Sequence, residues 1–307
     1  MASKLKARTP EEVQPGRIKG VLFGEPGAGK TWLALSFPAP FFIDTEGGAS
    51  LARYQARLKA SGGGYFGRDD GSLDPEAVLG QIEALATEKH PYKTLVIDSL
   101  SKIYQSIIAR EQERLGDKDA FGASKKPAIA WARRLVTWLD RMDLNTWLVC
   151  HELTRWEGTG TDRHEAGKTA DIWEKLIYEL HLTLQVRKIG KGIREAVVAK
   201  SRLEGFPDFD RFYLQKDETD VGYVNFTERY KRDFIEAAVR PVILATPEEV
   251  AEIVRMLEIV KIPQETQDKW FAKAGVDSFS EFTAEQAQGV LSFLNSKMAP
   301  STAKKAS

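Results

Sequence analysis

The sequence predicts an α/β protein with a mostly parallel central sheet and an antiparallel extension, followed by a small all-helical module. Between residue 18 and about residue 205, short apolar runs alternate with segments of helical periodicity, which is typical of a parallel sheet covered by helices. The last two apolar runs are separated only by the short segment IGKGIR, so these two strands should be antiparallel. From residue 246 onward, helix-capping patterns replace the strand pattern.

Six apolar runs are expected to form the strands of the sheet. They are IKGVLF (18–23), PFFID (40–44), KTLVID (93–98), NTWLVC (145–150), LHLTLQVRK (180–188) and EAVVAK (195–200). Segments 74–89 and 126–142, which lie between them, have the apolar spacing of helices. Lys191-Gly192 predicts a hairpin turn between the last two strands. Residues 206–240 are less regular, and a helix is expected at 228–239.

Two capping patterns predict the C-terminal helices. Thr246-Pro247-Glu248-Glu249 combines an N-cap, a proline at the first helical position and a glutamate at the third, and Thr283-Ala284-Glu285-Gln286 is a second cap. We therefore divide the chain into a flexible N-terminal segment (1–17), a main domain (18–240), a small helical module (246–298) and a disordered tail (299–307). The module has nine acidic and five basic residues, which argues against simple phosphate binding there.

The composition describes an ordinary soluble protein, and we expect it in the cytoplasm. Of 307 residues, 42% are hydrophobic and 29% are charged, and the 44 basic residues balance 44 acidic ones. With zero net charge, any nucleic-acid-binding surface must be local. Cys150 is the single cysteine, which excludes an intrachain disulfide and fits a reducing compartment. The N-terminus lacks the apolar stretch of a signal peptide, and no apolar run approaches the roughly 20 residues of a membrane span.

The segment GEPGAGKT (24–31) has the G-x-x-x-x-G-K-[ST] pattern of a phosphate-binding loop between a strand and a helix. Its glycines allow the backbone to wrap phosphates with the N–H groups inward, and the helix N-terminus adds its dipole. Lys30 is expected to neutralise the β- and γ-phosphates of ATP, and Thr31 to ligate Mg²⁺. The predicted nucleotide-binding residues are Gly24, Glu25, Pro26, Gly27, Ala28, Gly29, Lys30, Thr31 and Trp32.

Two other strand ends carry carboxylates. Asp98 ends KTLVID, where it could hold Mg²⁺ opposite Thr31. One large class of P-loop ATPases has a glutamate directly after this aspartate, but this chain has Ser99, so the group that activates water must lie elsewhere. Glu46, just past the strand FFID, is the best candidate for that base, because ligands collect at the carboxyl ends of parallel strands. A solvated loop carboxylate is the alternative for Glu46, and Asp44 is expected to be structural.

Five motifs occur in order along the chain: GEPGAGKT, FFIDTEGGASLARY, TLVIDSLSKIY, NTWLVCHELTR and VVAKSR. Together they resemble the RecA recombinase family, especially the smaller RecA-like ATPases that bacteriophages encode to support single-strand annealing. The resemblance covers roughly residues 18–205. It implies a RecA-like P-loop ATPase domain over 18–240, with Glu46 as the catalytic base and Asp98 as the magnesium ligand. It also implies that His151 or Glu152 senses the γ-phosphate.

The resemblance further implies an active site that is shared between subunits. VVAKSR aligns with a strand whose two basic residues reach the neighbour's ATP, which gives Lys200 and Arg202 the role of arginine fingers acting in trans. An exposed strand edge with alternating basic residues would explain these two equally well. If the family role holds, the active form is an oligomer.

Two loops would face single-stranded DNA in this family, GDKDAFGASKK (116–126) and RWEGTGTDRHEAGK (155–168). Their basic residues could contact phosphates and their aromatic residues could stack on bases. Acidic residues are interspersed, so ordinary solvated loops are the alternative. The predicted contacts are Lys118, Lys125, Lys126, Arg155, Arg163 and Lys168 for phosphates, with Phe121 and Trp156 for stacking.

These features predict an ATP-dependent, phage-type DNA recombination or single-strand annealing protein. It would hydrolyse ATP with Mg²⁺ and engage single-stranded DNA as an oligomer in the host cytoplasm, without membrane contact. Two alternatives stay open: a nucleotide-switched loading or adaptor protein that acts on a protein partner, and a RecA-fold helicase motor. The module 246–298 is similar to helical appendages of phage recombination proteins, which suggests a partner such as a single-strand-binding protein.

Overall fold

The computed structural model describes residues 16–120, 122–215 and 222–298. Phe121, the predicted tail at 299–307 and residues 1–15 of the predicted N-terminal segment lie outside these ranges. Gly16 and Arg17 are described, and the side chain of Arg17 is buried. Within the described ranges, no helix has both the length and the apolar character that crossing a membrane requires.

Eight strands of the described residues form one sheet, in the order β10-β9-β8-β1-β5-β4-β2-β3. The strands from β3 to β8 in this order are parallel to one another. Strand β9 pairs antiparallel with β8 on one side and with β10 on the other. The predicted mostly parallel sheet with an antiparallel extension is therefore confirmed. The strands are β1 Lys19–Phe23, β2 Pro40–Asp44, β3 Gly64–Phe66, β4 Thr94–Asp98, β5 Asn145–Cys150, β8 Leu182–Lys188, β9 Arg194–Ser201 and β10 Arg211–Gln215.

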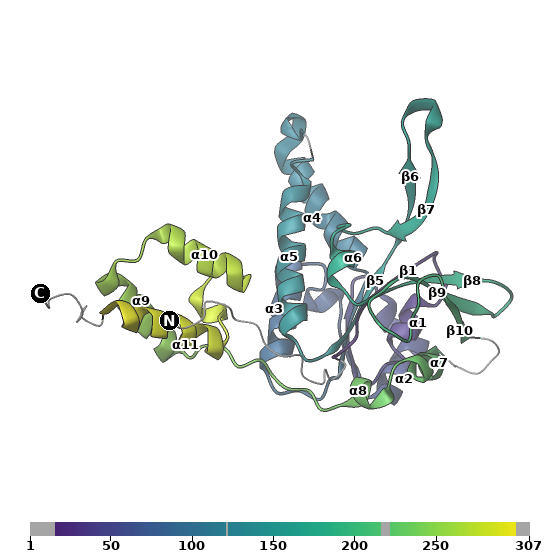
Figure 1. The fold of residues 1–307 in the computed structure, drawn as a ribbon. Coiled ribbons are helices and arrows are strands. Elements are labelled where there is room, and N and C mark those ends of the chain that lie inside the picture. The colour runs from purple at the N-terminus through teal and green to yellow at the C-terminus, as the bar shows by residue number, and fades with distance from the viewer. Residues whose placement is uncertain (1–15, 121, 216–221, 299–307) are drawn as a thin grey trace, which may run out of the picture.

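Helices cover both faces of this sheet (Figure 1). Helices α3 to α6 pack on one face, and α1, α2, α7 and α8 pack on the other. The helices of the main domain are α1 Lys30–Ala34, α2 Ala52–Ser61, α3 Pro75–Thr87, α4 Leu100–Leu115, α5 Lys125–Arg141, α6 Leu176–Glu179, α7 Gly222–Arg229 and α8 Arg232–Glu236.

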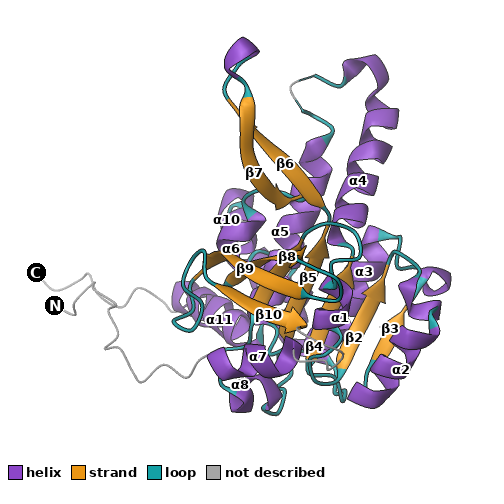
Figure 2. Cartoon of the chain, turned by 90° about the vertical axis from the view of Figure 1, so that its right-hand side faces the viewer, coloured by secondary structure: helices purple, strands orange, loops and turns teal. Residues whose placement is uncertain are grey.

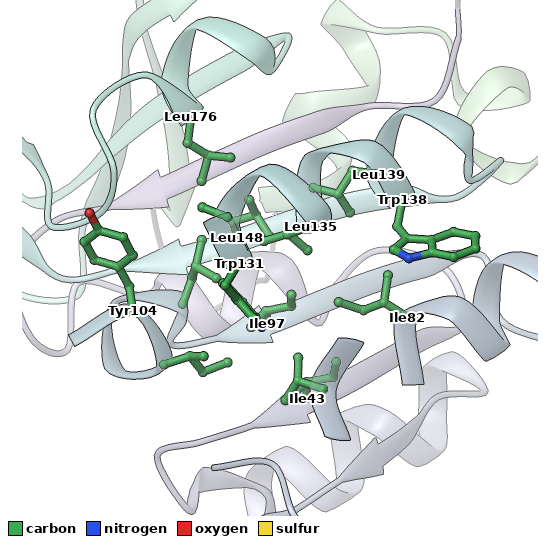
Figure 3. Close-up of a cluster of buried hydrophobic side chains, with 14 of the residues drawn as sticks. Ile43, Ile82, Ile97, Tyr104, Trp131, Leu135, Trp138, Leu139, Leu148 and Leu176 are labelled. Carbon is green, nitrogen blue, oxygen red and sulfur yellow. The ribbon is translucent and has the colours of Figure 1, made fainter. Parts of the chain in front are cut away.

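Side chains of the central strands alternate between two hydrophobic cores. In β4, Leu95 and Ile97 belong to the core under α4 and α5, whereas Val96 belongs to the core on the other face. In β5, Leu148 and Trp147 divide in the same way. Figure 3 shows the first core, where Ile97 and Leu148 lie beneath the apolar side chains of α5. Because both faces are buried, these strands are continuous apolar runs, which is why the sequence predicts them well.

A second, two-stranded sheet projects from the carboxyl edge of the main sheet (Figure 2). It consists of β6 (Glu152–Glu157), which follows β5, and β7 (His164–Ala170), and the two pair antiparallel. The segment 155–168, which was predicted as a loop, is instead mostly part of a β-hairpin. Thr154 and Trp156 favour a strand, and Lys168 Nζ of β7 donates to Thr154 Oγ1 across the pair at 2.8 Å.

The C-terminal module consists of α9 (Pro247–Val260), α10 (Gln264–Ala274) and α11 (Ala284–Met298), which enclose a small core of their own. Both predicted caps are present: Thr246 and Glu249 form a capping box, and Thr283 and Gln286 bond each other reciprocally. Arg141 at the end of α5 donates to Ala274 O and Glu281 O at 2.7 and 2.8 Å. These bonds fasten the module to the main domain.

The structure departs from the sequence prediction in the region 206–240 and at one sheet edge. The single helix expected at 228–239 is wrong, because α7 ends at Arg229 and α8 ends at Glu236. Arg17 donates to the carbonyls of Phe234, Ile235, Ala237 and Ala238, so these groups are satisfied without further helical turns. Strands β3 and β10 were not expected, since β3 is three residues long and neither segment is a continuous apolar run.

Candidate nucleotide site

The phosphate-binding loop connects β1 to α1 and has the strained glycines that its pattern requires. Gly24 has a φ of 146°, and a Cβ there would collide with the carbonyl oxygen of Val186 on β8. Lys30, the first residue of α1, donates from Nζ to Gly24 O at 2.7 Å and to Glu25 O at 3.0 Å. Burial lowers the pKa of Lys30, although Asp98 opposes this shift. Two backbone carbonyls of the loop therefore hold the ammonium in place.

The other predicted residues of the loop lie in different surroundings: some pack on the core or on β8, and some line a cavity beside the loop. Ala28 is buried in the core under the loop. Pro26 O accepts a hydrogen bond from Lys188 Nζ at 2.7 Å. A cavity of about 320 Å³ lies against the loop, and its lining includes Trp32 and Tyr54. These two rings lie 6.4 Å apart, so the cavity has a polar end at the loop and an aromatic end beside α2.

The two predicted magnesium ligands lie in direct contact. Thr31 Oγ1 donates to Asp98 Oδ2, which joins the start of α1 to the end of β4. Burial, together with the neighbouring carboxylates Glu46 and Asp44, raises the pKa of Asp98 to about 6, against the opposing effects of Thr31 and Lys30. A hydroxyl and a buried carboxylate among like charges suit a hard divalent cation, which takes oxygen ligands. These residues therefore fit Mg²⁺.

Asp44 shapes the loop that carries Glu46. Its Oδ1 accepts hydrogen bonds from the backbone N–H groups of Glu46, Gly47 and Gly48 at 3.0, 2.8 and 3.1 Å. Its Oδ2 accepts from the N–H of Ala49 at 2.7 Å. Both oxygens of Asp44 are thus bonded to the loop backbone. This geometry supports the structural role that the sequence suggested for Asp44.

Glu46 lies in a polar cluster made by three elements. Ser99 Oγ donates to Glu46 Oε1 at 2.8 Å, and His151 Nε2 lies 3.3 Å from the same oxygen. Lys102 Nζ is 4.0 Å from Glu46 Oε2. Partial burial raises the pKa of Glu46, but the hydrogen bond from Ser99 and the charges of Lys102 and His151 together lower it below its ordinary value. The carboxylate is therefore ionised, oriented and 40% exposed at the edge of the loop.

The structure separates the two candidates for the γ-phosphate sensor. His151, just after β5, lies 3.2 Å from Ser99 Oγ through its Nε2, in addition to its contact with Glu46. Glu152 accepts a hydrogen bond from Gln185 Nε2 of β8 at 2.9 Å. Only His151 of the two is bonded into the cluster around Glu46.

Lys200 and Arg202 do not lie at the phosphate-binding loop of their own chain. In the sheet, Lys200 is level with Thr183 near the start of β8, whereas the loop follows the other end of β1. Lys200 Nζ donates to Leu180 O, and Arg202 donates to Tyr178 O. Both residues thus face the amino edge of the sheet.

Several polar residues near the site were missed by the sequence prediction. Ser99 and Lys102 were not assigned roles, although the cluster around Glu46 depends on them. Arg53 and Arg194 line the cavity beside the loop. For Ser99 the signal was its place directly after Asp98, whereas the positions of the other three depend on strand order and were not visible locally.

The predicted DNA-contacting residues lie on two projecting segments. Lys125 and Lys126 begin α5, after the short connection from α4 that also carries Lys118. The remaining residues lie on the β6–β7 hairpin, which extends in the same direction as that connection in both views (Figure 1, Figure 2). Trp156 is 51% exposed, and the Arg163 guanidinium lies 4.9 Å from its ring centroid.

Two of the hairpin cations also form ion pairs within the hairpin. Arg155 pairs with Glu157 and Lys168 pairs with Glu165, both at 2.8 Å. These exposed pairs are weak, because water screens the two charges and both side chains lose conformational freedom in pairing.

Comparison with known proteins identifies a family for the region that carries the phosphate-binding loop. No curated protein matches the chain. Among solved structures it is similar to a crystal structure of the RadB recombinase, with 18% identity and a TM-score of 0.41 over 63% of this chain and 84% of that chain. A family model described as an AAA domain (AAA_24) matches residues 17–203, more than half of the 307 residues, and this span includes the phosphate-binding loop, Glu46 and Asp98. The chain therefore belongs to the AAA_24 family of AAA domains.

Proposed function

We propose that the protein is an Mg²⁺-dependent ATPase that engages single-stranded DNA as an oligomer, in recombination or single-strand annealing. The observation that carries the ATPase part is the arrangement at the carboxyl edge of the sheet. There Glu46, fixed by Ser99 and His151, lies at the same edge as the bonded pair Thr31–Asp98 and Lys30. A phosphate-binding loop supplies the binding, and an oriented carboxylate supplies the general base that hydrolysis needs.

In this proposal each side chain has one task. When ATP binds, the Lys30 ammonium exchanges its hydrogen bonds to the loop carbonyls for hydrogen bonds to the β- and γ-phosphates. Thr31 and Asp98 hold Mg²⁺, which would neutralise phosphate charge in the transition state. Glu46 accepts a hydrogen bond from the attacking water and orients it in line with the γ-phosphate. His151 donates a hydrogen bond toward the γ-phosphate and links its presence to the position of Glu46 through Ser99.

The DNA part of the proposal is supported by the two projecting segments. The hairpin presents an exposed Trp156, and the α4–α5 connection presents Lys118, Lys125 and Lys126 on the same side of the molecule. Aromatic stacking with nearby cations is the usual basis of sequence-tolerant binding to single strands. Because β6 follows directly after His151, a DNA-dependent shift of the hairpin would be transmitted to the cluster around Glu46.

The oligomer part of the proposal concerns Lys200 and Arg202. Because they lie at the sheet edge opposite their own loop, they could reach only the nucleotide of another copy. A mixture of Lys30→Ala with the double variant Lys200→Ala/Arg202→Ala tests this. If the residues act in trans, mixing restores part of the hydrolysis that each variant lacks. If mixing restores nothing, the trans role is wrong.

The decisive experiment measures steady-state ATP hydrolysis of the wild type and of Glu46→Gln, each with and without single-stranded DNA. We expect DNA to raise the wild-type rate several-fold, and Glu46→Gln to lower it by about 100-fold or more while ATP still binds. Asp69→Asn, an exposed carboxylate after β3 at the same sheet edge, serves as the matched control and should hydrolyse normally. Normal hydrolysis by Glu46→Gln would show that Glu46 is only a loop carboxylate.

A DNA-specific variant separates the two parts of the proposal. Trp156→Ala should reduce the DNA-stimulated rate and leave the DNA-free rate unchanged, with Tyr178→Ala, another exposed aromatic residue, as its control. Stimulation that is equal in Trp156→Ala and the wild type would remove the hairpin from the DNA-binding surface.

The C-terminal module favours a second candidate, a nucleotide-switched adaptor that acts on a protein partner. Its α10 and α11 border a cavity of about 580 Å³ that Trp270, Phe282 and Phe293 line. The acidic character of residues 246–298 fits a protein better than a nucleic acid. If the wild type hydrolyses ATP through Glu46 but single-stranded DNA neither binds nor stimulates, the adaptor function replaces the DNA function.

A further inference from the structure

The β8–β9 hairpin places two basic side chains directly against the phosphate-binding loop. Lys188 ends β8 and Arg194 begins β9, and the two are paired across the hairpin. Lys188 Nζ donates to Pro26 O at 2.7 Å. A Cβ built on Gly27 would lie 3.4 Å from Lys188 Nζ, and one built on Gly29 would lie 2.9 Å from Arg194 Cδ. The loop and the hairpin are therefore in contact along two of the loop's glycines.

The two cations contact different residues of the loop. Lys188 bonds the loop through Pro26 O. Arg194 lines the same cavity as Lys30, Thr31 and Trp32. Its Nη1 also donates to Gly192 O in the hairpin turn at 3.2 Å, which holds one terminal nitrogen of the guanidinium at the turn. The planar guanidinium has five N–H donors and matches phosphate oxygens in a bidentate manner.

We propose that Arg194 is a nucleotide-contacting residue that binds the phosphates in cis, and that Lys188 positions the loop for it. This rests on the proposed function only in that the bound nucleotide is ATP. The hairpin belongs to the same chain as the loop, and Arg194 lies at the carboxyl edge, whereas Lys200 lies six residues further along β9 toward the amino edge. Strand β9 thus begins with Arg194 beside the nucleotide site of its own chain. Near its other end, Lys200 and the following Arg202 face the amino edge, away from that site.

The close approach of Arg194 gives a reason for Gly29 beyond its backbone conformation. Any side chain at this position would have to displace Arg194 Cδ from the loop. With Arg194 acting in cis, each chain would bind the triphosphate of ATP with its own positive charges and without a neighbouring subunit. Nucleotide binding would then precede assembly, and only hydrolysis would need a neighbour.

The test measures displacement of a fluorescent ATP analogue by ATP and by adenosine, for the wild type, Arg194→Ala, Arg194→Lys and Arg187→Ala. Arg187 is the matched control, because it lies on the same hairpin and bonds Gln185 Oε1. We expect Arg194→Ala to weaken ATP binding about tenfold and to leave adenosine binding within about twofold. Arg194→Lys should fall between Arg194→Ala and the wild type, and Arg187→Ala should match the wild type.

Two outcomes would overturn the inference. If Arg194→Ala binds ATP as tightly as the wild type, Arg194 does not contact the phosphates. If it loses ATP and adenosine affinity equally, it shapes the cavity and contributes no phosphate contact. A wild type that binds no ATP would overturn the proposed function as well, so the two failures are distinguishable. Thermal unfolding without nucleotide checks that each variant is folded.

Mixing separates action in cis from action in trans. Arg194→Ala is combined with Lys30→Ala, which keeps Arg194 but lacks the loop lysine. A residue that acts in cis is not replaced by a neighbour, so the mixture should hydrolyse no faster than the sum of its parts. Recovery of hydrolysis would assign Arg194 to the neighbour's nucleotide and overturn the cis role.

Discussion

Two lysines near the two ends of β1 have the same chemistry and different roles. At the amino edge, Lys19 Nζ donates to Met142 O and Leu144 O at 2.6 and 2.7 Å, just past the end of α5. At the carboxyl edge, Lys30 Nζ donates to Gly24 O and Glu25 O, which belong to its own loop. Burial lowers the pKa of both side chains.

The difference lies in what each ammonium bonds. Lys19 joins segments that are more than 100 residues apart in the sequence, so its two hydrogen bonds stabilise the fold. Lys30 bonds carbonyls within six residues of itself and borders a cavity, so a ligand can replace those partners without disturbing the core. Lys19 is therefore structural because its partners are distant in sequence, whereas Lys30 is available for binding because its partners belong to its own loop.

The largest expected effect is a loss of stability caused by a change at the amino edge of the sheet. Arg17 makes five hydrogen bonds, one to Asp143 and four to backbone carbonyls around the end of α8. Arg17→Met should destabilise the protein by about 3–5 kcal/mol, because it leaves the partly buried Asp143 carboxylate and four backbone carbonyls without this partner. Urea unfolding measures the loss. Arg17→Lys, which keeps the charge without the planar fork, should lose less, and a loss below about 1 kcal/mol in Arg17→Met would contradict the structural role.

The matching change at the carboxyl edge of the sheet is Lys30→Ala. It should reduce ATP hydrolysis by about 100- to 1,000-fold, because a charge that stabilises the transition state is lost. The melting temperature without nucleotide should stay near that of the wild type. Lys59→Ala, an exposed lysine on α2, is the control for both measurements. If Lys30→Ala unfolds the protein, the distinction between the two edges fails.

The pH dependence of stability should sharpen the contrast. Burial lowers the pKa of Lys19 to about 7 from its ordinary value of 10.5, against Asp140 and Asp143, which raise it. Between these two values the unfolded chain binds more protons than the folded one, so stability rises with pH, by up to about 1.4 kcal/mol per pH unit. Lys19→Met should flatten this rise. Urea unfolding at pH 7 and pH 9 measures it, and equal slopes in variant and wild type would show that Lys19 stays charged in the fold.

The smallest expected effect is a fall in ATP hydrolysis when Asp44, which orders the Glu46 loop at the carboxyl edge, is changed. Asp44→Asn replaces an acceptor oxygen by an NH₂ group next to one of the four backbone N–H groups that bond Asp44, so the Glu46 loop should shift. We expect hydrolysis to fall about tenfold with ATP binding unchanged. Single-turnover and binding measurements separate the two quantities. Asp74→Asn at the N-cap of α3 is the control, and equal hydrolysis by both variants would deny Asp44 its positioning role.

Prediction from sequence succeeded where the signal is local. The loop 24–31, the strands that end at Asp44 and Asp98, and the caps at Thr246 and Thr283 depend on neighbouring residues, and the structure has each of these elements. The hairpin at 152–170 was missed because its polar, glycine-containing segment has no continuous apolar run. The end of α8 at Glu236, short of the predicted 239, was missed because Arg17, more than 200 residues away, bonds the carbonyls that would have continued the helix.

By itself, the sequence determined that the chain has a phosphate-binding loop, which strand ends carry carboxylates, and where the C-terminal helices begin. Only the tertiary structure decided that β2 lies beside β4, which brings Glu46 to Ser99, and that β8 and β9 return Arg194 to the loop. The physical reason is the sequence separation of the residues that interact. Turns, caps and periodicity are set by residues within a few positions of one another, whereas strand order is set by the burial of both sheet faces at once.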